Sequence, residues 1–572
     1  MAKEIIKKII KKAIKDLFPE IKIPEVKIEH PEDKKFGDYS TNLAFLISKA
    51  LKRDPFQVAN QIVSSIKNQK IFEKVEVKKP GFINFFLSID FLLLKLKRIL
   101  KEKEDYGKSK IGKGKTVIID YSSPNIAKPF GVGHLRSTIL GHSLYKIYKF
   151  LGYKTIRDNH IGDWGTQFGK LIFAIKKWGK KEIKNYSLEE LEELYVRFHK
   201  EAENNPKLEE EGRKWFKKLE DKDKEAIKIW KALIKISLKE FEKIYNLLGV
   251  KFDVVLGESF YEPMIKGIIE QLKKKRITKE SNGALIIEFP QNEFPPAIIK
   301  KSDGTTTYFL RDLATIKYRL KRWKPYLIIY EVGADQKLYF QQLFKTIKVL
   351  GWAKRTKLVH VAHGLYRTKT GKFSTRKGRT LHLEDVLREI IERAREIIEK
   401  SEISKKFSEK EKERISKIVG IGAIKYNDLS QNPLTDIIFD WKKILNLKGN
   451  SAPYLQYTFL RCKSILKKAK TMKIQNFKLR IEKLTKEEIE ILREIYKFPE
   501  IVREAGEKFS PNLICNFVFD LAKKYNFFYD SYPIIGAEDK EIKKFRLALT
   551  KSVAQVIKNS LSLLGIQTPP KM

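Results

Sequence analysis

The stretch Thr116–Leu151 constrains the fold most strongly, because its residue pattern changes from strand-like to helical across one loop. A buried-type run, TVIIDY at Thr116–Tyr121, precedes a glycine-spaced loop, and a helical pattern follows over His134–Leu151. A second strand-like run lies near Lys154–Asp158. Two strands joined by a crossover helix make a βαβ unit, which requires a parallel sheet. The sequence therefore predicts an α/β nucleotide-binding fold.

The same alternation returns further along the chain. A charged helical segment, about 176–248, interrupts the first half. The second half has a strand at Tyr326–Val332, a helix at Leu338–Leu350 and a strand at Leu358–His363. Because such sheets bind ligands at the carboxyl ends of their strands, the loops there are the expected site.

The two ends of the chain differ from this centre. Residues 1–100 combine apolar helical segments with a strand-like run at Gly81–Leu87, which predicts a small α+β domain. Beyond Leu381 the pattern is helical throughout, with Pro and Gly at the breaks. We expect three domains, at 1–100, 115–400 with an inserted segment of about 176–248, and 401–572.

Charge and composition restrict the function. The 572 residues carry 117 Lys and Arg against 71 Asp and Glu, a net charge of +46, while 42% hydrophobic residues exclude a disordered polycation. This excess attracts polyanions and favours a nucleic-acid partner. No apolar run reaches the length of a membrane span. The two cysteines, Cys462 and Cys515, allow neither a disulfide framework nor a four-cysteine zinc site. We expect a cytoplasmic protein with no metal site of its own.

The loop Ser122–His134 (SSPNIAKPFGVGH) is the strongest candidate for a phosphate site. Gly131 and Gly133 allow a ligand to approach the backbone, and His134 stands at the start of a helix, where anions bind. Arg136 occupies the position of the third glycine of the dinucleotide fingerprint. The pattern alone is weak, and a histidine that caps the helix is the alternative.

A series of motifs in the same order as in one family removes that ambiguity. The chain resembles the arginyl-tRNA synthetases, which are class I aminoacyl-tRNA synthetases, along nearly its whole length. The matching segments are HPEDKKFGDYSTNLAF (His30–Phe45), PGFINFFL (Pro80–Leu87), SSPNIAKPFGVGHLRSTILG (Ser122–Gly141), HIGDWGTQFGKL (His160–Leu171), GES (Gly257–Ser259), DGTTTYFLRDLAT (Asp303–Thr315), GADQ (Gly333–Gln336), KFSTRKG (Lys372–Gly378), GAIKYNDLSQN (Gly422–Asn432), GNSAPYLQYTFLRCKSIL (Gly449–Leu466) and KSVAQVIKNSLSLLGI (Lys551–Ile566).

The resemblance implies both a fold and a reaction. The fold is multidomain, α/β plus all-α: a Rossmann-like catalytic domain with a helical insertion, a small α+β N-terminal domain that contacts tRNA, and a C-terminal helical anticodon-binding domain. The reaction is ATP-dependent ligation of L-arginine to its tRNA through arginyl-adenylate, with release of AMP and pyrophosphate. ATP would bring Mg²⁺ with it. The resemblance also implies that tRNA binds before arginine is activated, and we expect a monomer.

The resemblance assigns the ATP site to two signatures. Gly131, Gly133 and His134 correspond to the HIGH motif, and the loop of KFSTRKG corresponds to KMSKS, with Lys372 and Ser374 as catalytic residues and Phe373 as a further ATP contact. Gly131 replaces the first histidine of HIGH, and Thr375 replaces a lysine of KMSKS. The family carries a lysine just upstream of HIGH. We therefore expect Lys128 to supply the missing positive charge as a catalytic residue.

A cationic substrate requires carboxylates, and the matched positions contain them. The resemblance places the arginine guanidinium at Asp312, with Tyr308 and Glu258 in the same pocket, because a carboxylate takes a guanidinium bidentately. Asn125 and Gln336 match the contacts to the amino-acid end of the substrate. Taken singly, each of these residues is more often a surface or capping residue than a ligand, and it is their agreement in order that favours the pocket.

Candidate tRNA contacts follow from the same resemblance. Phe82 and Asn84 lie in the N-terminal module, while Tyr454, Tyr457 and the C-terminal residues that end at Met572 lie in the helical domain. The alternative for each aromatic residue is a place in a core. Asp163, Trp164 and Gln167 are expected to line the catalytic cleft, without an assigned role.

Two other functions remain open at this point. A class I ligase for lysine or glutamine would share the catalytic domain, but two acidic pocket residues disfavour glutamine and the arginine-family motifs disfavour lysine. A paralogue that binds RNA without charging it would account for Gly131 and Thr375. His134→Ala separates this second alternative from an active ligase. In a paralogue that only binds RNA, the substitution would change nothing beyond RNA affinity.

Overall fold

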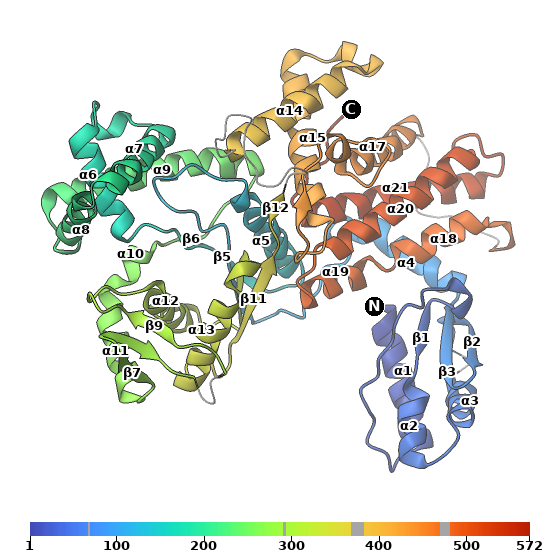
Figure 1. Cartoon of the computed structure of the whole chain (residues 1–572). Coiled ribbons are helices and arrows are strands. Elements are labelled where there is room, and N and C mark those ends of the chain that lie inside the picture. The colour runs from blue at the N-terminus through green and yellow to red at the C-terminus, as the bar shows by residue number, and fades with distance from the viewer. Residues whose placement is uncertain (67–68, 290–292, 368–381, 470–480) are drawn as a thin grey trace.

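The computed structural model describes residues 1–66, 69–289, 293–367, 382–469 and 481–572. Figure 1 shows an N-terminal module set apart from a central α/β body and a large helical C-terminal part. No helix in these ranges is both long and apolar enough to cross a membrane.

A parallel sheet of five strands forms the centre of the catalytic body. Its order is β11-β10-β4-β5-β6, with β4 at Thr116–Asp120, β5 at Lys154–Asn159, β6 at Val254–Val255, β10 at Leu327–Gly333 and β11 at Lys357–His363. The order reverses between β4 and β10, which opens a crevice at their carboxyl ends. Val117, Ile118 and Ile119 are fully buried, because helices cover both faces of the sheet. The Rossmann-like prediction is confirmed.

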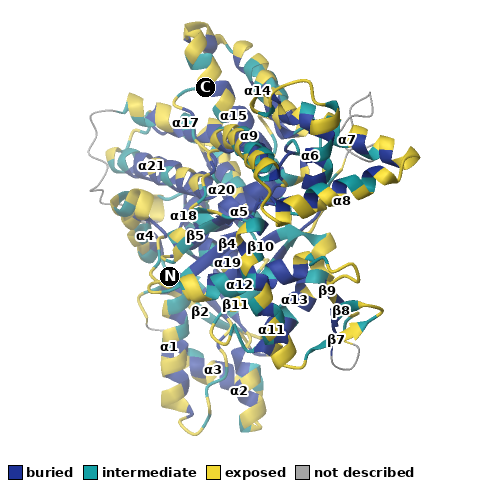
Figure 2. Cartoon of the chain, turned by 90° about the vertical axis from the view of Figure 1, so that its left-hand side faces the viewer, coloured by how far each residue is buried: buried dark blue, intermediate teal, exposed yellow. Residues whose placement is uncertain are grey.

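Helices complete this body. After β4 the chain forms α5 (Gly133–Phe150), whose side chains from Leu135 to Leu144 are all buried, as its dark colour in Figure 2 shows. The predicted helical insertion consists of the end of α6 (Thr166–Trp178), α7 (Leu188–Asn204), α8 (Lys207–Glu220) and α9 (Lys224–Leu248). In the second half, α12 (Tyr308–Trp323) precedes β10, and α13 (Lys337–Leu350) follows it.

One part of the second half was not predicted from the sequence. Between α11 (Ile265–Lys274) and α12 lies an antiparallel sheet of β7 (Thr278–Ser281), β8 (Ala284–Ile287) and β9 (Ala297–Lys300). Asn282 and Gly283 join β7 to β8, and both have positive φ, at 48° and 75°. An Asn-Gly pair is the preferred sequence of such a two-residue hairpin turn, so the turn itself had a sequence signal. The flanking strands have only four residues each, which is too short to show a clear alternation.

The N-terminal module is the α+β unit that the sequence predicts. Its antiparallel sheet has the order β1-β3-β2, with β1 at Tyr39–Thr41, β2 at Phe72–Lys78 and β3 at Phe82–Leu87, and its helices are α1 (Ala2–Leu17), α2 (Leu43–Leu51) and α3 (Pro55–Ile66). Helix α4 (Ile89–Glu102) leads from it to the catalytic body. The module contacts the C-terminal helices: Tyr39 donates a hydrogen bond to Glu500 over 2.9 Å, and Arg493 pairs with Asp38 at 2.5 Å.

The C-terminal part is a helical bundle with one short exception. It contains α14 (Leu383–Glu399), α15 (Glu409–Leu429), α16 (Trp441–Ile444), α17 (Ala452–Lys468), α18 (Lys486–Ile495), α19 (Phe498–Glu507), α20 (Asn512–Ser531) and α21 (Lys540–Leu563). The expectation of helices alone beyond Leu381 is wrong at β13 (Ile437–Ile438), which pairs in parallel with β12 (Tyr366–Arg367). Two residues are too few to show an alternating pattern.

Candidate active site

The loop after β4 is held in a strained backbone conformation. Ser122, Ser123 and Ala127 all have positive φ, at 75°, 45° and 60°, although none is glycine. Such residues persist only where their surroundings fix them, and they concentrate at functional sites.

Two residues of the inserted helix α9 fix this loop. The Ala127 amide donates to the Ser237 hydroxyl over 2.9 Å, and the Ser122 hydroxyl lies 2.8 Å from the Tyr245 hydroxyl. Ser123 donates its amide to Asn159 at the end of β5 over 3.1 Å. The helical insertion therefore supports the loop that leads into α5.

The glycine turn leaves free space at the start of α5. A Cβ added at Gly133 would meet no heavy atom within 4 Å, and one at Gly131 would meet only His134 Nδ1, at 3.8 Å. Both glycines have ordinary φ angles, so neither is required for an unusual backbone conformation. What they provide is open space in which a ligand can approach the backbone. His134 packs edge-on against Phe130, and its buried Nδ1 has no hydrogen-bond partner in the described part of the chain. Burial lowers the pKa of His134, which favours the neutral imidazole.

Lys128 lies on the insertion side of this turn. Its ammonium is 5.0 Å from the centre of the Tyr195 ring in α7. Both residues are half-buried, and no carboxylate pairs with Lys128 in the described part of the chain. Lys372, Phe373, Ser374 and Thr375 lie outside the described residues. His382, which follows them, bridges to Gly131, and Leu383 donates to the Phe130 carbonyl over 2.7 Å.

The segment His160–Trp164, just after β5, connects the residues expected to bind the amino acid. Gly162 forms a parallel bridge with Asn125, and the Ile161 carbonyl accepts from the Glu258 amide over 3.2 Å. His160 Nε2 lies 3.8 Å from the Asp312 carboxylate. Sequence reasoning assigned no role to His160, although its place after a predicted strand was a usable signal.

Asp163 and Trp164 of this segment have a structural function. The Asp163 carboxylate accepts two hydrogen bonds from Ser259, from the amide over 2.8 Å and from the hydroxyl over 2.6 Å, and its carbonyl accepts from Trp230 Nε1. Trp164 packs against the Trp230 and Phe216 rings of the insertion. These contacts fix the start of α10 (Glu258–Tyr261) beside the sheet.

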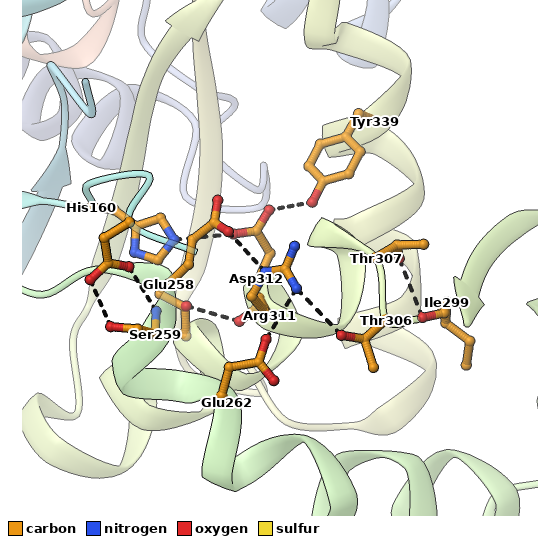
Figure 3. A network of polar contacts seen from close by, with 12 residues as sticks. His160, Glu258, Ser259, Glu262, Ile299, Thr306, Thr307, Arg311, Asp312 and Tyr339 are labelled. Carbon is orange, nitrogen blue, oxygen red and sulfur yellow. Dashed lines mark hydrogen bonds and ion pairs between the residues drawn. The ribbon is translucent and has the colours of Figure 1, made fainter. Parts of the chain in front are cut away.

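The two acidic pocket residues have different partners (Figure 3). Glu258 forms an ion pair of 2.9 Å with Arg311, which also pairs with Glu262 at 3.1 Å. Asp312 instead accepts a hydrogen bond from the Tyr339 hydroxyl and faces His160. Among the described residues, no Lys or Arg forms an ion pair with Asp312. Burial raises the pKa of Asp312, and it raises that of Glu258 to about 8 against the opposing effect of Arg311.

The remaining arginine-site candidates lie at the rim. Tyr308 begins α12, is 55% exposed, and has the Arg311 guanidinium 4.8 Å from its ring centre. Asn125 is exposed beside Gly162, and Gln336 is exposed at the end of β10. Glu258, Tyr308 and Asp312 thus lie around His160 and Arg311, and Asn125 lies beside Gly162 of the same segment.

A buried ion cluster below the pocket was missed by sequence reasoning. Arg319 of α12 is fully buried and pairs with Asp120 at 2.7 Å and with Asp158 at 2.9 Å. These carboxylates lie at the ends of β4 and β5, so the cluster ties α12 to the two central strands. Removal of one member would leave a buried charge unpaired, which is strongly destabilising.

A second buried cluster joins the two signature regions. Arg136, in α5, lies 3.5 Å from Asp428 and donates to the Thr435 carbonyl over 2.5 Å. Tyr366, in β12, donates to the same Asp428 over 2.5 Å. Because the KFSTRKG loop follows β12, Arg136 and Asp428 link the helix of the first signature to the strand that leads into the second.

The candidate tRNA contacts lie in two different environments. Phe82 is 41% exposed at the start of β3, and Tyr457 is 47% exposed beneath the Arg461 guanidinium. Asn84 is 1% exposed and accepts from the Ser40 hydroxyl, while Tyr454 accepts from Asn526 over 2.9 Å. Met572 packs against the cluster between α14 and α15.

Three family models match the chain in order. They are the "Arginyl tRNA synthetase N terminal domain" over residues 4–87, "tRNA synthetases class I (R), catalytic domain" over 95–441, and the "DALR anticodon binding domain" over 455–572. The second of these covers the strands of the parallel sheet from β4 to β11, the strained loop and the glycine turn at α5. The fold and the site therefore define a class I aminoacyl-tRNA synthetase.

Whole-chain relatives identify the family within this class. The arginine–tRNA ligase of Halothermothrix orenii is 43% identical over 95% of both chains, and that of Clostridium perfringens is 43% identical over 99% of this chain and all of the relative. The crystal structure of arginyl-tRNA synthetase from Plasmodium falciparum superposes with a TM-score of 0.84 at 29% identity, covering 100% of this chain and 99% of the other. The Thermus thermophilus arginyl-tRNA synthetase has the same TM-score at 22% identity, with both chains fully covered, and supports the fold. The chain belongs to the arginyl-tRNA synthetase family.

Proposed function

We propose that this chain ligates L-arginine to its tRNA in an ATP-dependent reaction of protein synthesis. The observation that carries the proposal is Asp312, a carboxylate enclosed by Tyr339 and His160 and left without a Lys or Arg partner in the described structure. A guanidinium is the planar cation that such a carboxylate binds bidentately. Tyr308 offers a ring at the rim, and Asn125 and Gln336 are the polar groups for the amino-acid end.

In the first step, an oxygen of the arginine carboxylate attacks the α-phosphorus of ATP. The bond from that phosphorus to the bridging oxygen breaks, pyrophosphate leaves, and arginyl-adenylate forms. Positioning and charge neutralisation dominate such a transfer. The free space over Gly131 and Gly133 and the unpartnered nitrogen of His134 fit a bound nucleotide. Lys128, with Lys372 and Ser374 of the second signature, would hold the phosphates, together with the Mg²⁺ that ATP carries, and Phe373 would be a further ATP contact.

In the second step, a hydroxyl of the 3′-terminal ribose of tRNA attacks the arginyl carbonyl carbon. The bond from that carbon to the adenylate oxygen breaks, and AMP leaves. We assign tRNA contact to the domains at 1–100 and 401–572, through Phe82, Tyr454, Tyr457 and Met572, and catalysis to 115–400. Asn84 is left out of these contacts, because it is buried and accepts from Ser40. A monomer in the cytoplasm is the proposed form. The charge of +46 supports a polyanionic partner.

ATP–pyrophosphate exchange tests this function directly. Exchange is measured with arginine, with and without the arginine tRNA, and beside direct charging of that tRNA. Exchange that requires tRNA, accompanied by charging, is the expected result. Lysine and glutamine serve as competing substrates and should give neither signal. His134→Ala should reduce exchange with little change in tRNA affinity, whereas an RNA-binding paralogue would bind tRNA without exchange in either form.

A further inference from the structure

A second cavity lies apart from the candidate active site. It has a volume of about 660 Å³, and its walls come from α5, the end of α9, α15, α21 and the chain that follows α21. It thus lies where the catalytic body, the insertion and the C-terminal bundle meet. None of the proposed ATP or arginine contacts lines it. Its size is that of a small-molecule site.

The charged groups that line this cavity are all cationic. The cations are Lys146, Lys417, Lys425 and Lys558; His142 also lines the cavity, but burial lowers its pKa well below the usual range and favours the neutral imidazole, and no Asp or Glu is present among the described lining residues. Two of the lysines have carboxylate partners outside the lining: Lys417 pairs with Glu413 at 2.7 Å, and Lys558 pairs with Glu104 at 3.0 Å. The other three groups have no such partner in the described part of the chain.

Lys425 is the most deeply buried of these three. It is 4% exposed, and its ammonium donates to the Leu248 carbonyl over 2.5 Å and to the Gly565 carbonyl over 2.7 Å. An ammonium has three donors, so one remains for a further acceptor. Burial lowers the pKa of Lys425 to about 7, the effect expected for a buried cation without a counter-charge.

His142 and Lys146 present further unused polar groups. His142 is 5% exposed, and its buried Nδ1 has no hydrogen-bond partner among the residues that the structure describes. Lys146 lies one helical turn further along α5, and burial together with the nearby Lys149 and Arg157 lowers its pKa. A cavity with a buried ammonium that faces no carboxylate, and a buried imidazole nitrogen without a partner in the described structure, is costly to leave uncompensated.

We propose that this cavity binds a phosphate group through Lys146, Lys425 and His142. A phosphate supplies negative charge and several acceptor oxygens, which are the two things that the cavity lacks. The same chemistry could come from a free phosphate-bearing ion or from the backbone of RNA. The depth of Lys425 and His142 favours the small free ion.

Lys146→Ala tests the site with Lys149→Ala as its control. Both residues lie on α5 and both substitutions remove one positive charge, but Lys149 is exposed, donates to Tyr145 and does not line the cavity. Binding of inorganic phosphate and of pyrophosphate is measured by titration calorimetry at constant ionic strength. We expect one saturable site in the wild type and in Lys149→Ala, with at least tenfold weaker binding in Lys146→Ala. Thermal melts without ligand confirm that both variants are folded.

A second measurement identifies the source of the phosphate. If free phosphate does not bind, the salt dependence of tRNA affinity is compared between the two variants. If the slope of log affinity against log salt falls by about one counterion in Lys146→Ala but not in Lys149→Ala, an RNA phosphate occupies the cavity. That result would support the phosphate site, with RNA and not a free ion as the source. Equal phosphate binding and equal salt slopes in both variants would overturn the proposal.

Discussion

Arg311 places its guanidinium 2.9 Å from the carboxylate of Glu258, in the pocket proposed to bind a guanidinium substrate. The next residue, Asp312, points its carboxylate toward Tyr339 and His160 (Figure 3). Consecutive residues of α12 therefore divide the pocket. Arg311 supplies a cation that pairs with Glu258 inside the protein, whereas Asp312 supplies a carboxylate that remains available to a ligand. The two acidic residues are not equivalent, and selectivity for a cation should depend mainly on Asp312.

Asp312→Asn should abolish most arginine-dependent activity. The loss of a buried charged partner costs about 2–5 kcal/mol, which corresponds to roughly 30- to 5,000-fold in kcat/KM. Charging kinetics with varied arginine measure the effect. The control is Asp335→Asn, an exposed acid at the end of β10, which should leave kcat/KM within about twofold. Similar losses in both variants would contradict the assignment.

The affinity for arginine should rise with pH through the ionisation of Glu258. Its pKa is raised to about 8, so the carboxyl is mainly protonated at pH 7 and mainly ionised at pH 9. Only the ionised form of Glu258 neutralises Arg311, whose charge otherwise repels the substrate guanidinium beside Asp312, and the KM for arginine should therefore fall over this range. Glu258→Gln should remove that fall. An unchanged pH profile of KM in Glu258→Gln would show that another group titrates.

Arg136→Met should destabilise the fold by about 3–5 kcal/mol, because it leaves Asp428 buried without its cation. Replacement of both, as Arg136→Met with Asp428→Leu, should recover much of that loss. Urea unfolding measures the stability. Arg98→Met, which breaks the exposed pair with Glu102, should cost less than about 1 kcal/mol. An additive double variant would argue against a coupled pair.

Ser237→Ala should destabilise the strained loop after β4, although Ser237 lies in α9 and outside the loop. It removes the acceptor of the buried Ala127 amide, which costs about 1–3 kcal/mol. The KM for ATP should rise as well, because Ala127 adjoins Lys128 and the glycine turn. Ser552→Ala is the control, since the buried hydroxyl of Ser552 has no partner among the described residues. Equal stability of the two variants would show that the loop does not depend on α9.

Sequence patterns were sufficient for the elements with a clear period. The strand at Thr116–Tyr121 and the helix at His134–Leu151 were predicted within one residue of β4 and α5, because a fully buried strand and a long helix are distinct patterns. The β7–β8 hairpin was missed, because its strands are short and its signal is confined to Asn282 and Gly283.

The site was predictable only where a family motif marked it. Asp312 and Glu258 were found through matched segments, but no motif shows that Arg311 turns toward Glu258. The buried pair of Arg136 and Asp428 joins residues far apart in sequence, and Arg136 was noted only as a departure from a glycine pattern. Such partners depend on tertiary packing, which local sequence does not encode.

The docking of the N-terminal module on α19 also sets an order of events during synthesis. Tyr39 cannot form its hydrogen bond until Glu500, which lies 461 residues later, has been synthesised. At about 5–20 residues per second, the ribosome needs roughly 20–90 s to supply that partner. The module must therefore hold its own shape alone for that time, and nascent chains stalled before and after Glu500 should differ in protease protection at this surface. The N-terminal module is thus the first part of the chain to be synthesised and among the last to reach its final position in the fold.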